Sequence, residues 1–118
     1  AAALTMTGFW LWSAATWTVP SLPEGWAGVD LELGRSLGRD GSLERQKELL
    51  AAVKRKAGEG ARVAVLPESA LGLWTPTVER LWRSELRGTS VTVIVGAAIV
   101  GHSGYDNVLV AVSGEGAV

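Results

Sequence analysis

The sequence contains no cysteine, a single histidine, and no charged residue before position 24. Without cysteine, the chain has no disulfide framework, no thiolate metal site and no cysteine nucleophile of its own. His102 alone cannot hold zinc, which takes three or four protein ligands, so we expect neither a metal nor another cofactor. The 11 basic and 12 acidic residues give a net charge of −1. Nucleic-acid binding relies on a basic excess, so we expect no nucleic-acid partner.

The lack of charge sets residues 1–23 apart as an apolar lead to the remainder of the chain, residues 24–118. A membrane helix needs roughly 20 mostly apolar residues, and tryptophan favours the headgroup level of a bilayer. Trp10, Trp12 and Trp17 near the end of the lead fit a membrane-helix remnant. Its several Thr and Ser side chains favour the alternative, a buried or interfacial segment rich in aromatics. Both interpretations stay open.

The first half of residues 24–118 reads as a strand, a loop and a helix. Apolar and charged residues alternate through residues 26–33, the period of a half-buried strand. Three glycines among charges at residues 34–41 indicate a loop. Ser42 is a suitable N-cap, and Gly58 or Gly60 ends the helix that follows. The expected apolar stripe of this helix is Leu43, Leu50, Val53 and Ala57.

The second half adds three strands and one more helix. Residues 62–66 form a short apolar run that suits a strand buried on both faces. Thr75 and Pro76 open a helix that ends at Gly88. Residues 91–100 and 107–113 read as strands of a hairpin with a turn at 101–106. The order strand, helix, strand, helix, strand, strand predicts an α/β fold with a mixed sheet.

One carboxylate stands where chemistry is expected in such a fold. Pro67 ends the buried strand and Glu68 follows it directly. Ligands of open α/β sheets bind at the carboxyl ends of the strands, and a carboxylate beside apolar strand ends is a candidate general base. The alternative is a solvated loop carboxylate.

Three segments resemble the nitrilase, or carbon–nitrogen hydrolase, superfamily. "VAVLPESALGLW" is similar to its catalytic-Glu segment, and "VTVIVGAAIV" with "GYDNVLVAVSGEGAV" is similar to its next hairpin. The charge-free lead resembles the membrane-anchored branch, which includes apolipoprotein N-acyltransferase and the TraB-type conjugal transfer proteins. "LPEGWAGVDLELGRSLGRD" looks closest to the TraB-type group. The resemblance implies the first part of an α-β-β-α sandwich, truncated before its second half.

The family works through a Glu–Lys–Cys triad, and only the Glu has a counterpart here. Glu68 matches the general base that draws a proton from the thiol. The family's Lys and Cys fall after the hairpin, beyond Val118. We therefore expect this chain alone to show no amidase, nitrilase or acyltransferase activity, because a base without nucleophile or oxyanion support cannot complete acyl transfer.

Three further residues are candidates for the site. Asn107 matches the family's Asn at the start of this strand, and a structural role fixing the turn is favoured. Trp74 lies just before the second helix and Trp82 lies on its apolar face; both are substrate-pocket candidates, with core packing as the alternative.

Two functions remain open for the longer protein. The first is an amide hydrolase or acyltransferase associated with plasmid conjugal transfer, acting on a small amide, nitrile or acyl substrate. The second is a non-catalytic, membrane-associated conjugation component that keeps the fold for partner contacts. We expect a bacterial inner-membrane location if the lead spans the bilayer, and a cytoplasmic one otherwise. Exposed apolar strands 91–100 and 107–112 predict self-association.

Overall fold

A computed structural model describes residues 2–31, 42–68 and 70–118 of the chain. Their secondary structure consists, in chain order, of α1 (Ala2–Thr16), β1 (Trp26–Gly28), α2 (Leu43–Gly58), β2 (Val63–Val65), α3 (Pro76–Leu86), β3 (Thr92–Gly101) and β4 (Gly104–Val112). From β1 onward, the described elements follow the predicted order of strands and helices. The expectation of a mixed α/β fold is confirmed, whereas the α-β-β-α sandwich stays a prediction.

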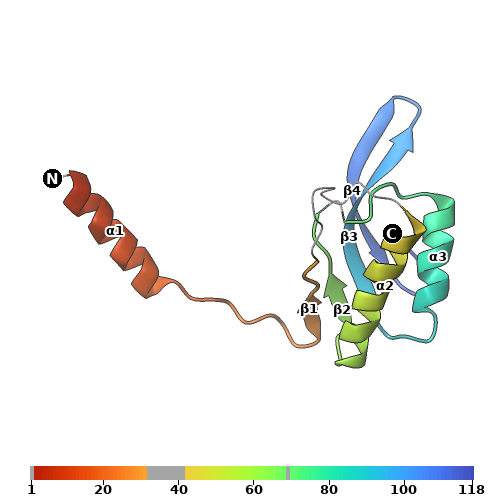
Figure 1. Ribbon diagram of the computed structural model, residues 1–118, viewed down its shortest axis with the longest axis horizontal. Helices are drawn as coiled ribbons and strands as arrows, with labels where there is room; N and C mark the ends of the chain where they lie inside the picture. Colours follow the sequence, from red (N-terminus) through yellow and green to blue (C-terminus); the bar gives the residue numbers. More distant parts are fainter. Residues whose placement is uncertain (1, 32–41, 69) are drawn as a thin grey trace.

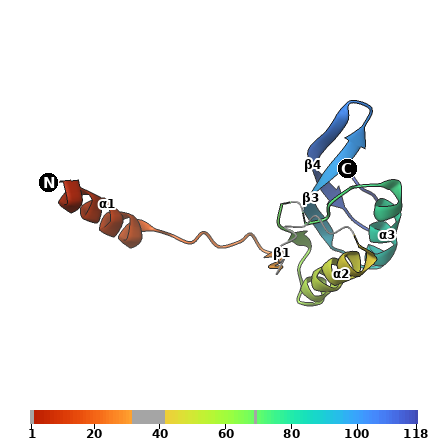
Figure 2. The same cartoon turned by 45° about the horizontal axis from the view of Figure 1, so that its top comes forward.

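The four strands form one sheet in the order β1-β2-β3-β4. β1 is parallel to β2 and β2 to β3, while β3 and β4 form an antiparallel hairpin. Right-handed crossovers between successive parallel strands put both connecting helices on the same side of a sheet. Figures 1 and 2 show α2 and α3 together on one side of this sheet.

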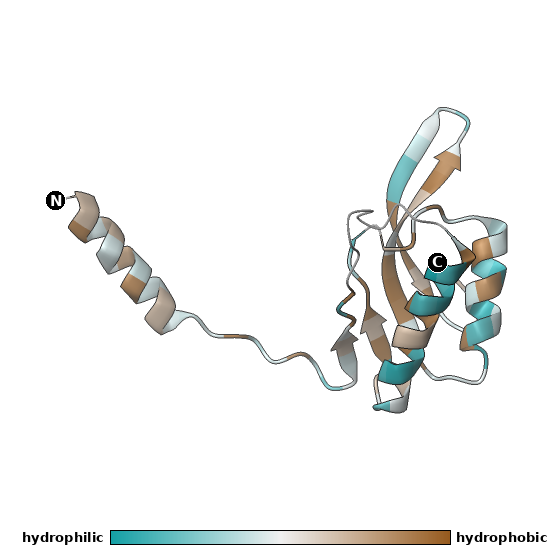
Figure 3. Ribbon diagram, in the orientation of Figure 1, coloured by the Kyte–Doolittle hydropathy of each residue, from teal (hydrophilic) through white to brown (hydrophobic). Residues whose placement is uncertain are grey.

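The core lies between the sheet and these two helices. Alternate residues of β3, among them Val93 and Val95, are fully buried, as are Val53 of α2 and Trp82 of α3. Side chains alternate between the two faces along a strand, so these buried residues of β3 all point toward the helices. No described helix covers the opposite face of the sheet. Figure 3 shows that β2 and β3 are largely apolar.

The predicted N-caps of α2 and α3 are confirmed. The Ser42 hydroxyl accepts a hydrogen bond from the Arg45 N–H at 3.2 Å, and the Thr75 hydroxyl accepts one from Val78 N–H at 3.2 Å. Each cap satisfies one of the free N–H groups of a first turn. The predicted stripe of α2 was wrong at one position, because Leu43 is 52% exposed. Leu43 opens the helix, and the buried residues of α2 begin only at Gln46.

Two strand predictions need correction. The first strand covers only Trp26–Gly28 of the predicted 26–33, with residues 32–33 and the predicted loop at 34–41 outside the described residues. β1 pairs only where β2 supplies a partner, residues 63–65. The hairpin turn is also tighter than predicted. Gly101 pairs with Gly104, whose φ of 138° suits glycine, so residues 104–106 belong to the strand and not to the turn.

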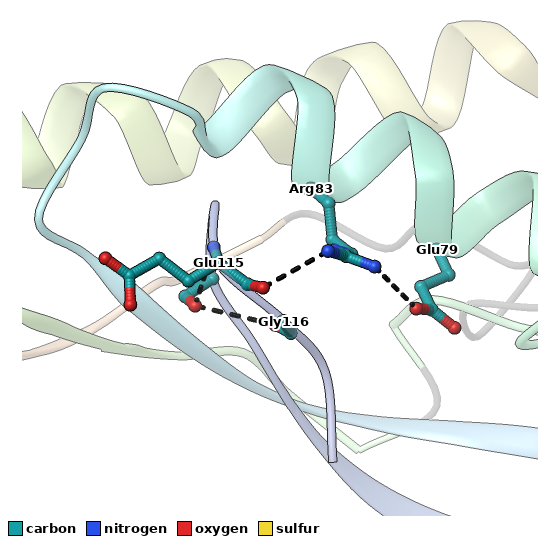
Figure 4. A network of polar contacts seen from close by, with 5 residues as sticks. Glu79, Arg83, Glu115 and Gly116 are labelled. Atoms are coloured by element: carbon teal, nitrogen blue, oxygen red, sulfur yellow. Dashed lines mark hydrogen bonds and ion pairs between the residues drawn. The ribbon is translucent and has the colours of Figure 1, made fainter.

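The segment after β4 folds back against α3 (Figure 4). The Arg83 side chain of α3 links the helix to this turn. Its guanidinium pairs with the Glu79 carboxylate of α3 at 3.4 Å and donates to the Glu115 carbonyl of the turn at 3.1 Å. Beyond the turn, Val118 N–H donates to the Ala111 carbonyl and Ala111 N–H to that of Val118, at 3.0 and 2.8 Å. The turn thus returns the chain to the outer edge of β4.

The apolar lead is helical over Ala2–Thr16, and all of its described residues are exposed. Its apolar side chains lie on every side of the helix, and Figure 1 draws it apart from the sheet. Across residues 2–31, 42–68 and 70–118, no helix is both long enough and apolar enough to cross a membrane. The interpretation of residues 1–23 as a membrane-helix remnant therefore stays a prediction.

Candidate functional site

Glu68 lies where the sequence places it, just beyond the carboxyl end of β2. Leu66 N–H still donates to the Ile94 carbonyl of β3 at 2.9 Å, so the chain follows the sheet up to Pro67. Pro67 has no N–H to extend the ladder, and its carbonyl accepts from Ala70 N–H at 3.2 Å, which turns the chain. Glu68 is therefore an exposed residue at this turn.

The Glu68 residue forms part of a shallow hollow of about 330 Å³ on the sheet. Its walls come from the end of β2, the middle of β3 and the first half of β4; they consist of Leu66, Glu68, Gly96, Ala97, Asn107, Val108 and Leu109. Gly96 has no side chain, so β3 leaves room between the turn after β2 and β4. The hollow brings together two predicted site residues, Glu68 and Asn107, from strands that are not neighbours in the sheet.

The sequence predicted Asn107 at the start of its strand, and this prediction was wrong. Asn107 lies inside β4, opposite Ala98 of β3, and the turn lies between Gly101 and Gly104. Neither its carboxamide nor the Glu68 carboxylate has a hydrogen-bond partner within the described part of the chain. A carboxylate that accepts and a carboxamide that both donates and accepts are thus available to a ligand in one hollow.

A second hollow of about 630 Å³ lies on the other side of Leu66. It is bounded by the segment before β1, by β1 itself and by the end of β2; its lining is Leu22, Trp26, Ala27, Gly28, Val29, Asp30, Val65, Leu66 and Pro67. The lining is mostly apolar, with one carboxylate at Asp30. The turn that bears Glu68 therefore separates a hollow with two polar side chains, Glu68 and Asn107, from a larger and more apolar one.

A buried polar group that the sequence analysis did not identify holds the loop after Glu68. Gln46 of α2 is only 3% exposed, and its amide donates to the Leu71 carbonyl at 3.2 Å. Its side-chain oxygen accepts the indole N–H of Trp82 at 2.6 Å. Since a buried amide is costly unless satisfied, this network fixes the loop relative to both helices. The available signal was a glutamine one turn before Leu49 and Leu50.

The same loop is anchored to β3 at its far end. Trp74 N–H donates to the Ala98 carbonyl, and Ala98 N–H donates to that of Gly72, both at 2.8 Å. Neither predicted pocket residue is among the residues that line the two hollows. Trp82 is fully buried in the core, and Trp74 packs partly against it. Trp82 thus holds the loop through Gln46, and Trp74 belongs to the loop itself.

The lysines closest in sequence to Glu68 are engaged elsewhere. Lys54 donates to Glu85 of α3 at 2.6 Å, and Lys56 donates to Glu59 at 2.8 Å. The Lys54 hydrogen bond and its positive charge lower the pKa of the Glu85 carboxyl below its ordinary value. Within the described ranges, no three His, Asp or Glu side chains are grouped to hold a metal ion. The residues that line the hollow at Glu68 thus include a carboxylate and a carboxamide and no cation.

Comparison with known proteins identifies close relatives. The chain is 65% identical over 113 residues to conjugal transfer protein TraB of Agrobacterium fabrum, covering 96% of this chain and 27% of that protein. It is 58% identical over 116 residues to a probable conjugal transfer protein TraB of Sinorhizobium fredii, covering 98% of this chain and 30% of that one. The chain therefore spans less than a third of the length of the curated relatives it matches.

No family model matches the chain, and no solved structure matches it. The resemblance to the TraB-type group is confirmed by the two relatives, which share most of this sequence. Their names describe conjugal transfer and state no enzymatic activity. The relationship to carbon–nitrogen hydrolases and N-acyltransferases stays a prediction.

Proposed function

We propose that this chain is the part of a TraB-type protein that supplies the general base for amide hydrolysis or acyl transfer during plasmid conjugal transfer. The association with conjugation is supported by the 65% and 58% identity to proteins of that name over nearly the whole chain. The chemistry is supported by one observation: Glu68 and Asn107 meet in a single hollow at the carboxyl end of β2.

In this proposal, Glu68 takes the proton of a cysteine thiol located in the remainder of the longer protein. The thiolate sulfur attacks the carbonyl carbon of a small amide or acyl substrate, and a lysine outside this chain stabilises the oxyanion. The leaving group departs with the proton that Glu68 received, and water or an acceptor amine then releases the acyl group. The Gln46 network keeps the loop after Glu68 in place.

The proposal also assigns α1 to a lipid bilayer or its surface, at the bacterial inner membrane. Phe9 and Trp10 are 67% and 68% exposed in a helix that carries no charge. Thr7 and Thr16 donate their hydroxyl protons to carbonyls one turn back, at 2.8 and 2.7 Å. Satisfied in this way, threonine is compatible with an apolar environment.

A mating assay tests the catalytic part in the full-length protein. Deleting the gene should lower plasmid transfer, and Glu68→Gln, which keeps size but cannot accept the thiol proton, should lower it equally. The matched control is Glu115→Gln, an exposed carboxylate in the turn after β4 that lines neither hollow. Purified 118-residue chain should show no amidase turnover.

The same assay separates the competing function, a non-catalytic component that uses the fold for contacts. The uncovered face of the sheet favours that alternative, because apolar strand surface is a docking surface. If deletion abolishes transfer while Glu68→Gln transfers normally, the base role is wrong and the contact role stands. Amidase turnover of the isolated chain that disappears with Glu68→Gln would show that no outside cysteine is needed.

A further inference from the structure

Residues 70–74, which follow the turn that bears Glu68, are held from the helix side of the fold. Ala70 and Leu71 are fully buried in the core. The Leu71 carbonyl accepts a hydrogen bond from the side-chain amide of Gln46, which belongs to α2, at 3.2 Å. The exposed Glu68 is therefore attached to a segment whose own position depends on α2.

The same segment is held from the sheet side at one residue of β3, Ala98. Ala98 N–H donates to the Gly72 carbonyl, and the Ala98 carbonyl accepts from Trp74 N–H, both at 2.8 Å. Because both backbone groups of Ala98 point toward this segment, its pair with Asn107 is of the non-hydrogen-bonded kind, with about 4.5 Å between the Cα atoms. Asn107 and the segment after Glu68 thus lie on opposite sides of a single residue.

The contacts of this segment differ in how well they fix its position. Burial of the Leu71 side chain stabilises the segment without a preferred direction, since the hydrophobic effect is non-directional. A hydrogen bond requires a defined distance and angle between donor and acceptor. Gln46 is 3% exposed and is the one buried polar residue in the part of the chain that the structure describes. It supplies the directional contact between α2 and the segment.

We propose that Gln46 is a positioning residue, which sets the spacing of Glu68 and Asn107 in their shared hollow. Gln46 does not line the hollow and acts through the Leu71 carbonyl. The Trp82 indole N–H donates to the side-chain oxygen of Gln46 at 2.6 Å, and this orients the amide so that its nitrogen faces Leu71. The consequence for catalysis rests on the proposed function of Glu68, whereas the spacing itself does not.

The absence of cysteine allows the spacing to be measured in the 118-residue chain. A reference variant carries Glu68→Cys and Asn107→Cys, and a short bifunctional thiol reagent joins the two thiols within one molecule at a rate that mass spectrometry follows. Adding Gln46→Met, which keeps the size but cannot donate to Leu71, should lower this rate by about tenfold. The matched control is Val53→Ala, which removes buried volume farther along α2 and should leave the rate unchanged.

A second pair of variants tests the sheet side and keeps the experiment decisive if Gln46→Met does not fold. Gly72 and Gly88 have φ angles of 72° and 81°, where alanine is strained. Gly72→Ala disturbs the contact with Ala98 and should also slow cross-linking. Gly88→Ala introduces comparable strain at the end of α3, where a Cβ meets nothing within 4 Å, and should not. Equal rates for these two variants would contradict the role of the segment.

A mating assay with the full-length protein tests the catalytic consequence. Gln46→Met should lower plasmid transfer, and adding it to Glu68→Gln should lower transfer no further, because Gln46 acts through the base. Normal transfer by Gln46→Met beside defective transfer by Glu68→Gln would overturn the proposal. So would a cross-linking rate that Gln46→Met leaves unchanged or that Val53→Ala lowers equally. Normal transfer by Glu68→Gln would instead remove the base role, and the cross-linking rates alone would then decide whether Gln46 sets the spacing.

Discussion

The two faces of the sheet have similar residues and opposite surroundings. On the helix side, Val93 and Val95 are fully buried beneath α2 and α3. On the other side, the alternate residues of the same strands are partly or largely exposed, with Leu109 at 72%. Period-two alternation of apolar side chains would allow either face to be a core. What distinguishes them is that the crossover helices cover only one.

The comparison separates folding from function in this molecule. The covered face contains the buried residues, and its single buried polar side chain in the described ranges, Gln46, uses both its side-chain nitrogen and its side-chain oxygen in hydrogen bonds. Tyr105, Asn107 and Leu109 share the uncovered side, and all three are exposed there. A polar carboxamide and exposed apolar side chains thus occur together, which is the combination expected of a surface that meets ligands or other chains.

The largest effect is expected on the covered face. Trp82→Ala should lower the free energy of unfolding by about 3–5 kcal/mol, because it leaves a cavity in the core and removes the donor to the side-chain oxygen of Gln46. Leu109→Ala, which truncates a large side chain of the uncovered face, should change it by no more than about 0.5 kcal/mol. Urea denaturation of both variants measures the difference.

A milder variant keeps this comparison usable if Trp82→Ala does not fold. Trp82→Phe preserves most of the core volume but removes the indole N–H that Gln46 accepts, at an expected cost of about 1–3 kcal/mol. Comparable losses for Leu109→Ala and Trp82→Ala would contradict the comparison, since they would mean that the uncovered face is buried in solution.

The sequence predicted the covered face better than the uncovered one. Ser42, Thr75 and Pro76 fixed the helix starts, because capping depends on neighbouring backbone groups only. The hairpin turn was predicted too wide, at residues 101–106, because Gly104 and Asp106 are typical turn residues. Their backbone pairs with β3 regardless of side-chain polarity, so only the register reveals the longer strand.

The candidate site shows the same limit. Glu68 could be predicted because a proline next to a buried strand end is a local signal. Glu68 and Asn107 line the same hollow because the strand order places β3 between β2 and β4. No local sequence pattern encodes this strand order. Gln46 was missed for a similar reason, since its two partners are 25 and 36 residues away along the chain.

An intermediate effect is expected where the C-terminal turn packs beside the end of α3. A Cβ at Gly114 would lie 2.9 Å from both the Arg87 Cα and the Leu86 carbonyl oxygen. Backbone atoms cannot move aside cheaply, so Gly114→Ala should cost about 1–3 kcal/mol. Gly116→Ala is the matched control, because a Cβ there meets nothing within 4 Å. Equal thermal melts for the two variants would show that the turn is not packed against α3.

The smallest effect is expected at the surface of α2 and α3, the two helices that cover one face of the sheet. Lys54 and Glu85 join α2 to α3 there, and the pKa of Glu85 is lowered mainly by the Lys54 hydrogen bond. A carboxyl whose pKa is lowered by folding stabilises the protein above its unfolded pKa and loses that contribution as pH falls through the folded value. Glu85→Gln should therefore be slightly less stable than the parent near neutral pH, and the two should converge in acid.

The stability difference between the two proteins should also shrink in high salt, because both side chains are partly exposed. Urea midpoints at several pH values measure it; a gap that widens toward acid would show that Lys54 does not stabilise the carboxylate, and that apolar packing alone joins the two helices.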